Sequence, residues 1–260
     1  MRKPILIIII VLALIAAWIA FCGYAWSWGP FAKLHDLKTS KLPGNAEQYS
    51  IKNTAPLASS PLAGKNILFL GSSVTYGASS KGVSFADYIA VRNGAVMTKE
   101  AVSGTTLVDN GMNSYIARMK RLDRDMNVDL FVCQLSTNDA TQKKPLGEIS
   151  NDDSYDTSTV AGAIEFIISY ARDTWDCPVV FYTSPRYDSE AYADMVKLLT
   201  EIAQKWDISV IDMWNDAEFN AITGEQRALY LADPIHPTQA GYLEWWTPYM
   251  EQALYEVIEK

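Results

Sequence analysis

Apolar residues are distributed along this chain in two different ways. Residues 5–22 form an almost unbroken aliphatic run, and no charged residue occurs between Pro4 and Ala32. Together with residues 23–28, this run exceeds the ~20 residues that a bilayer-crossing helix needs. From Asn66 onward, short apolar runs instead alternate with longer stretches whose apolar residues recur at helical spacing. The pattern therefore predicts one transmembrane segment followed by a globular domain.

The alternation beyond Asn66 predicts the class of the fold. Strands are expected at residues 66–70, 97–102, 128–135, 179–183 and 208–211, and helices at residues 83–93, 111–126, 157–175, 187–206 and 237–258. Strands that alternate with helices form parallel sheets, because a crossover helix joins each strand to the next. We therefore expect an α/β fold, a three-layer α/β/α sandwich whose parallel sheet of about five strands is covered on both faces.

The same pattern divides the chain into three segments. Residues 1–32 form a basic tip and a membrane anchor, residues 33–64 form a polar stalk or linker, and residues 65–260 form the folded domain. Within the domain, residues 141–157 lack any apolar period. A loop of this length is either a lid or binding loop or a solvated insertion, and the pattern leaves both alternatives open.

The residues that flank the apolar run predict its orientation. Arg2 and Lys3 precede it and are expected to stay cytoplasmic. Aromatic residues that suit a membrane interface lie toward its other end: Trp18, Tyr24, Trp26 and Trp28. The domain is therefore expected on the extracytoplasmic side. A cleaved signal peptide is the alternative, but the apolar run is longer than the usual ~7–15 residues, which favours an uncleaved anchor.

Charge and cysteine usage exclude several classes of function. The net charge is −8, and without Arg2 and Lys3 it is −10, from 20 basic and 30 acidic residues. A nucleic-acid partner is not expected, because phosphate binding needs a basic surface. The three cysteines show no C-x-x-C or similar spacing. We therefore expect neither a metal site nor a cofactor.

The first strand leads into a candidate nucleophile. Residues 66–77 read NILFLGSSVTYG, an apolar run that ends in a turn rich in small hydroxyl residues. Gly71 lets the backbone bend sharply, and Ser73 then lies at the carboxyl edge of the sheet, where open α/β folds place their sites. An ordinary turn is the alternative, so the interpretation depends on partners for Ser73.

Histidine usage supplies one partner. The chain has only His35 and His236. His35 lies in the predicted stalk, where an exposed polar residue without a catalytic role is expected. His236 lies three residues after Asp233, so one turn can bring the carboxylate to the imidazole and orient it as a general base. Pro237 suits the first turn of a helix, which would place His236 near a helix N-terminus.

An attacking serine also needs donors for the oxyanion that develops on the substrate. Ser73 offers its own N–H group. Gly104 follows the second predicted strand and offers an N–H group that a substrate can approach closely. Asn138 follows the third strand and offers a side-chain amide. One polar group therefore follows each of the first three strands, with Asp233 and His236 beyond the fifth.

With these residues in place, the chain resembles an SGNH (GDSL-type) serine hydrolase from about Leu62 to its C-terminus. Residues 71–75 (GSSVT) resemble the nucleophile block, Gly104 the glycine block, residues 137–139 (TND) the asparagine block and residues 233–242 (DPIHPTQAGY) the final block. The resemblance implies a serine esterase with Ser73, His236 and Asp233 as its triad and with Ser73, Gly104 and Asn138 as its oxyanion hole.

The chain departs from the family pattern at three positions. Ser72 stands where the aspartate of the family name is expected, Ser136 replaces the usual glycine before Thr137, and Lys99 replaces a frequent asparagine. None of these changes removes a reacting group, but they weaken any transfer of substrate preference. Tyr76 and Arg186 lie in loops that should border the pocket, and they are weaker candidates for substrate binding.

The sequence thus predicts an exported, membrane-anchored ester hydrolase. Its expected substrate is an acetylated carbohydrate or another small ester, and its expected membrane partner is the bilayer that the N-terminal helix crosses. Two alternatives remain. An acyltransferase would pass the acyl group from Ser73 to a cell-surface glycan instead of water, and an inactive hydrolase-like domain would serve as a binding module.

Overall fold

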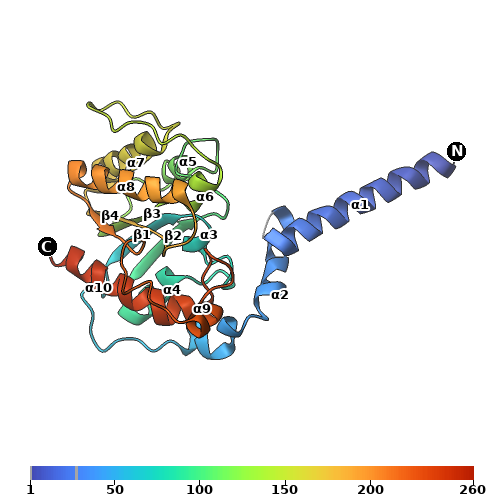
Figure 1. The fold of residues 1–260 in the computed structure, drawn as a ribbon, viewed down its shortest axis with the longest axis horizontal. Helices are drawn as coiled ribbons and strands as arrows, with labels where there is room; N and C mark the ends of the chain where they lie inside the picture. The colour runs from blue at the N-terminus through green and yellow to red at the C-terminus, as the bar shows by residue number, and fades with distance from the viewer. Residues whose placement is uncertain (1, 27–28) are drawn as a thin grey trace.

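The domain is built on a five-stranded parallel sheet of order β2-β1-β3-β4-β5. The computed structural model describes residues 2–26 and 29–260, so Trp28 lies outside the described residues. The strands are β1 (Asn66–Gly71), β2 (Val96–Ala101), β3 (Leu130–Gln134), β4 (Val179–Tyr182) and β5 (Ser209–Ile211). Helices cover both faces of this sheet (Figure 1), and the predicted three-layer α/β/α fold is confirmed.

Alternating side chains of each central strand serve two separate cores. Leu68 and Leu70 of β1 pack into one core, whereas Ile67 and Phe69 pack into the other. The first core is closed by α5 (Tyr115–Met119), α7 (Val160–Trp175) and α8 (Glu190–Trp206). The second is closed by α4 (Phe85–Asn93) and α10 (Thr247–Ile258). Because both faces are buried, the strands read as continuous apolar runs.

Two predicted helices are wrong in extent. The helix predicted at residues 111–126 is reduced to α5, because the Ser114 side chain accepts the N–H of Ala117 and begins the helix there. The helix predicted at residues 237–258 begins later, because Pro237 pairs with Leu231 in an isolated antiparallel bridge. The chain then forms a π-helical segment (Gly241–Trp246) that leads into α10.

Beyond Asn66, three short α-helices were not predicted. They are α3 (Ser73–Tyr76), α6 (Thr137–Thr141) and α9 (Gly224–Tyr230). Each helix spans only about one or two turns. Too few apolar positions therefore recur in it to give a helical pattern. Both α3 and α6 directly follow strands, so they begin at the carboxyl edge of the sheet.

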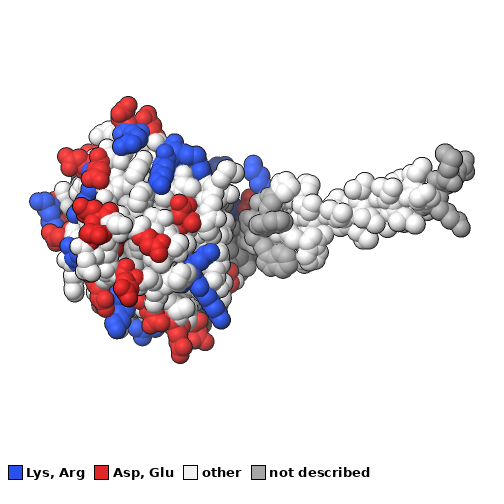
Figure 2. Space-filling view, turned by 90° about the horizontal axis from the view of Figure 1, so that it is seen from above, with Lys and Arg blue, Asp and Glu red and all other residues white. Residues whose placement is uncertain are grey.

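The N-terminal helix α1 (Arg2–Trp26) projects away from the domain (Figure 1). Its stretch Pro4–Tyr24 is long and apolar enough to cross a membrane, a criterion that a signal sequence also meets. Its large apolar side chains are exposed, unlike those of a core helix in a soluble protein. Figure 2 shows charged side chains of both signs over the domain and none along the part of α1 drawn in white.

The segment after α1 is fastened to the domain by Asn45. This segment includes η1 (Gly29–Leu34), α2 (His35–Thr39) and η2 (Pro43–Asn45). The Asn45 amide donates to the carbonyl oxygens of Thr39 at 2.8 Å and Ser79 at 2.7 Å, and its side-chain oxygen accepts the N–H of Gln239 at 2.8 Å. The prediction that His35 is exposed is wrong, since only 9% of its surface is accessible.

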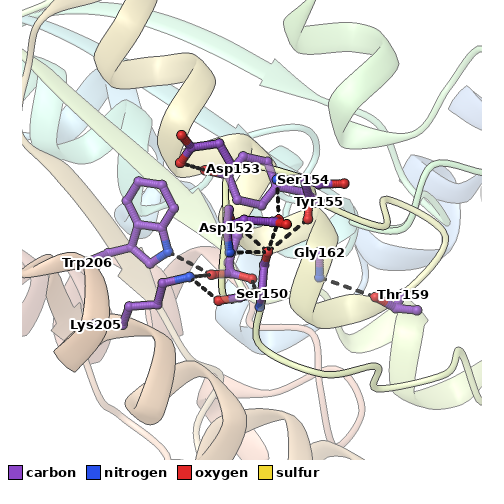
Figure 3. A network of polar contacts seen from close by, with 10 residues as sticks. Ser150, Asp152, Asp153, Ser154, Tyr155, Thr159, Gly162, Lys205 and Trp206 are labelled. Atoms are coloured by element: carbon purple, nitrogen blue, oxygen red, sulfur yellow. Dashed lines mark hydrogen bonds and ion pairs between the residues drawn. The ribbon is translucent and has the colours of Figure 1, made fainter.

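The long segment 141–157 packs beside α7 and α8. Figure 3 shows Ser150 at the centre of a polar network that includes Lys205. The buried carboxylate of Glu165 accepts the N–H of Ser150 at 2.8 Å and also pairs with Lys205. The buried Glu165 carboxylate on α7 thus joins the loop to α8. The hydrogen bonds that this carboxylate accepts compensate for the hydration that it loses on burial.

Candidate active site

Ser73 is the first residue of α3, directly after the sharp turn that ends β1. A Cβ atom at Gly71 would collide with the Thr75 hydroxyl, so only glycine allows β1 and α3 to approach this closely. Gly77 ends α3 in the left-handed conformation, with a φ of 86°. Ser73 is 7% exposed, so its hydroxyl is almost enclosed while it still lines a pocket.

Ser73, His236 and Asp233 are hydrogen-bonded in series. His236 Nε2 lies 2.8 Å from Ser73 Oγ, and His236 Nδ1 lies 2.8 Å from Asp233 Oδ2. An ionised carboxylate can only accept, so Nδ1 carries the hydrogen in this pair. In the neutral ring Nε2 is then the acceptor for the Ser73 hydroxyl, which is the geometry that a general base requires.

Asp233 is held in its ionised form. Burial by itself raises the pKa of this carboxyl group, but the hydrogen bond from the His236 ring, the favourable charge interaction with that ring and two backbone N–H groups outweigh it. The pKa falls from its ordinary value of 3.8 to about 2. The N–H groups are those of Ile235 and His236, both 2.9 Å from Asp233 Oδ1. The carboxylate therefore orients both the imidazole and its own turn.

The turn that carries His236 is closed by backbone hydrogen bonds. The Ala232 N–H donates to the His236 carbonyl oxygen at 2.9 Å, and the bridge between Leu231 and Pro237 lies next to it. The expected helix N-terminus at Pro237 is therefore wrong. His236 is positioned by this bridged turn and by Asp233 rather than by the first turn of a helix.

A pocket of about 360 Å³ lies against Ser73 and His236. Its other lining residues include small or polar side chains, among them Ala78, Ser79, Ser103, Gly104, Thr137 and Asn138. His35 of α2 also lines it. Of residues 141–157, all of which the structure describes, only Thr141 contributes. This placement favours the solvated insertion over the lid.

Gly104 and Asn138 both line this pocket. Gly104 has a φ of 80°, a conformation that suits glycine. The Asn138 amide donates one hydrogen to the Thr105 carbonyl oxygen at 2.9 Å. A side-chain amide has two hydrogens, so the second is available to a bound group. Asp139 accepts the N–H groups of Leu107 and Val108 and so fastens the loop after Gly104.

Gln134, a buried residue next to the nucleophile turn, was not among the predicted site residues. Its side-chain oxygen accepts the N–H of Ser72 at 2.9 Å and the hydroxyl of Thr75 at 2.8 Å. Because Thr75 donates its only hydroxyl hydrogen to Gln134, the Tyr182 hydroxyl at 2.6 Å must donate to Thr75. A polar residue at the end of an otherwise apolar strand was the available signal.

Arg118, whose side chain is almost fully buried, was also not predicted. Its guanidinium group donates to the carbonyl oxygens of Gly71 at 2.7 Å and Glu100 at 2.8 Å, and to the Thr105 hydroxyl at 3.2 Å. It therefore joins the end of β1 to the end of β2 and to the loop that contains Gly104.

The two weaker candidates lie outside the pocket. Tyr76 is 40% exposed, and its ring lies near the amino group of Lys99. Arg186 lines a separate pocket and contacts Trp214 and Asn215. Neither is among the residues that line the pocket of Ser73.

A parallel α/β sheet with a serine, a histidine and an aspartate linked at its carboxyl edge has the arrangement of a serine hydrolase. The chain belongs to the GDSL-like Lipase/Acylhydrolase family, whose model matches residues 69–243, more than half of the chain. The resemblance to SGNH hydrolases is thereby confirmed. No curated protein gives a significant match.

Solved structures share this fold at low sequence identity. A protein from Lactobacillus plantarum is 19% identical, with a TM-score of 0.62. The match covers 76% of this chain and 97% of the Lactobacillus protein. A protein described as a GDSL-like lipase from Bacteroides ovatus is 17% identical, with a TM-score of 0.57. The match covers 75% of this chain and 99% of that protein. A mutant of Axe2, an acetyl-xylooligosaccharide esterase from Geobacillus Stearmophilus, is 17% identical, with a TM-score of 0.53. The match covers 76% of this chain and 95% of the Axe2 chain.

Proposed function

We propose that this protein is a membrane-anchored serine ester hydrolase that removes acetyl or other short acyl groups from a glycan or a small ester, with its domain on the extracytoplasmic side. The observation that carries the proposal is the 2.8 Å contact between His236 Nε2 and Ser73 Oγ. Membership of a family of lipases and acylhydrolases supports an ester as the substrate.

In the proposed reaction, Ser73 attacks the ester carbonyl carbon while His236 takes the hydroxyl proton. Asp233 stabilises the imidazolium that forms. His236 then gives the proton to the departing alcohol, which leaves an acyl group on Ser73. A water molecule, deprotonated by His236, hydrolyses this acyl-enzyme and restores the free serine.

The negative charge on the carbonyl oxygen needs donors during both steps. We assign this role to the N–H groups of Ser73 and Gly104 and to the side-chain amide of Asn138. All three residues line the same pocket. Donors that are already oriented stabilise the developing charge without reorganising, and losing one typically costs ~10²–10³-fold in kcat.

The lining of the pocket supports a short acyl group. Ala78, Ser79 and Ser103 have small side chains, and the pocket contains few large apolar groups that would bury a long chain. A long acyl chain gains affinity through burial of its methylene groups, about 0.8 kcal/mol for each one. This pocket offers little surface for that gain, so we expect acetyl esters to be preferred.

The test combines active-site labelling with ester profiling of the full chain in detergent. A serine-reactive phosphonate should label the wild type and should not label Ser73→Ala. Esters of one alcohol with two, four, eight and twelve acyl carbons should show the highest kcat/KM for the shortest chains. An unlabelled wild type would favour an inactive binding module, and a preference for long chains would replace the short-acyl assignment.

A further inference from the structure

One residue, His35, touches both the end of the membrane helix and the candidate active site. Its Nδ1 atom lies 2.9 Å from the carbonyl oxygen of Tyr24, the last residue of the stretch that is long enough to span a membrane. The same side chain lines the pocket that holds Ser73 and His236. The pocket therefore lies within one side-chain length of the level at which the span ends.

Hydrogen bonds fasten the segment that follows this contact to the domain. Within α2, the Thr39 hydroxyl donates to the His35 carbonyl oxygen at 3.2 Å. Asn45 then joins Thr39 to Ser79, which itself lines the pocket. Asn45 is 2% exposed, so these hydrogen bonds are shielded from water. These hydrogen bonds hold α2 against the domain, so they restrict the height of the pocket relative to α2 more than a flexible linker would.

Two large apolar side chains are exposed in the segment that follows the span. Phe31 is 45% exposed and Leu37 of α2 is 60% exposed. A single exposed leucine indicates nothing by itself. Here both side chains belong to the segment that connects the span to the pocket, and apolar groups at that depth suit the layer between headgroups and acyl chains. Figure 1 shows the side of the domain that carries α3 and α6 facing α1.

We infer that the substrate is an acyl ester carried by a molecule anchored in the same bilayer, presented to Ser73 within the headgroup layer. This inference rests on the proposed esterase function and on the anchor. Confinement of enzyme and ester to one surface raises the effective concentration of the ester without any new contact. A lipid-linked sugar and a glycerolipid headgroup both present such an ester, so the shared chemistry is a short acyl ester on a lipid-anchored hydroxyl.

The test uses the full chain reconstituted in vesicles of neutral phospholipid. Three acetyl esters are compared: an acetylated glucoside with a long alkyl tail, the same acetylated glucoside with a methyl group, and an acetylated diacylglycerol. We expect kcat/KM for a tailed ester to exceed that for the methyl glucoside at least ~10-fold, and the preferred tailed ester distinguishes a sugar from a glycerolipid. Equal values for tailed and methyl esters would overturn the inference while leaving the esterase function intact. Failure to hydrolyse any ester would overturn the esterase function itself.

A linker insertion tests whether the fixed height matters. A flexible Gly-Ser segment of about 12 residues, spanning roughly 20 Å, is inserted after Lys41, between α2 and Asn45. We expect the ratio of tailed to methyl ester activity to fall toward one. The matched control carries the same insertion between Ala58 and Ser59, an exposed loop beyond Asn45, and should keep the wild-type ratio. An unchanged ratio in the first variant would contradict a fixed height.

Discussion

The side-chain oxygen of Gln134, at the end of β3, lies 2.8 Å from the hydroxyl of Thr75 in α3 and accepts its hydrogen. The same oxygen accepts the N–H of Ser72 at 2.9 Å. Ser72 directly precedes Ser73, and Thr75 lies in the same helix as Ser73. A single buried amide on a neighbouring strand therefore holds the backbone on both sides of the nucleophile.

Replacement of Gln134 should disturb this turn. In Gln134→Leu the N–H of Ser72 and the hydroxyl of Thr75 lose their buried acceptor, at a cost of about 1–3 kcal/mol in the free energy of unfolding. We also expect kcat to fall about 10-fold or more, because small displacements of a nucleophile are costly. Gln134→Glu keeps an acceptor oxygen and should retain more activity. Denaturant titration and steady-state kinetics on an acetyl ester measure both effects, and wild-type kcat in Gln134→Leu would contradict the positioning role.

Arg118 should be required for the loop that carries Gly104. Removal of its guanidinium group in Arg118→Met leaves the carbonyl oxygens of Gly71 and Glu100 without their buried donor. We expect a loss of about 3 kcal/mol in the free energy of unfolding. Arg118→Lys should not restore it, because an ammonium group cannot reproduce the planar fork of donors. Thermal unfolding of the two variants measures this, and a stable lysine variant would argue against the fork.

Asp233→Asn should lower kcat with little change in the fold. The asparagine oxygen can still accept the N–H groups of Ile235 and His236, but its amide donates to His236 Nδ1. The ring hydrogen then moves to Nε2, which can no longer accept the Ser73 proton. We expect a loss on the order of 10³–10⁴-fold in kcat. Steady-state kinetics and a circular dichroism spectrum check the two halves of this prediction, and a loss below 10-fold would exclude Asp233 as the orienting group.

The hydrogen bonds that the Asp233 carboxylate accepts predict a specific acid dependence of stability. The pKa of Asp233 is about 2 in the folded chain and ~3.9 when unfolded, so the unfolded state takes up the proton first as the pH falls. Its contribution to stability is therefore complete above pH ~4 and is lost as the pH approaches 2. The side chain is 46% exposed, so solvent screening keeps this contribution small. In denaturant titrations, the difference in the free energy of unfolding between wild type and Asp233→Asn should shrink as the pH falls from about 4 toward 2.

Loosening the loop 141–157 should affect stability but not catalysis. Glu165→Ala removes the carboxylate that binds Ser150 and Lys205, and we expect a loss of about 2 kcal/mol in the free energy of unfolding. Because this network does not line the pocket of Ser73, kcat/KM should stay within ~2-fold of wild type. Asp153→Asn, on the exposed part of the same loop, serves as the matched control. A large fall in kcat would restore the interpretation of this loop as a lid.

The sequence by itself determined the features that depend on local pattern. Continuous apolar runs identified β1, β3 and β4, because these central strands are buried on both faces. The aliphatic run before Tyr24 identified the helix that can span a membrane. Ser73, Gly104, Asn138 and His236 could be named because each follows a strand or lies in a restricted turn, and parallel strands bring their carboxyl ends to one edge.

Only the tertiary structure decided which distant side chains meet. The strand order places β3 beside β1, so Gln134 lies beneath Ser72, and nothing in the local pattern encodes that neighbour. His35 reads as a polar residue in a linker, yet the return of the chain through Asn45 brings it to the pocket. The local spacing of apolar residues indicates which positions of a helix or strand face the core. Which distant segments then lie side by side depends on the packing of the whole domain.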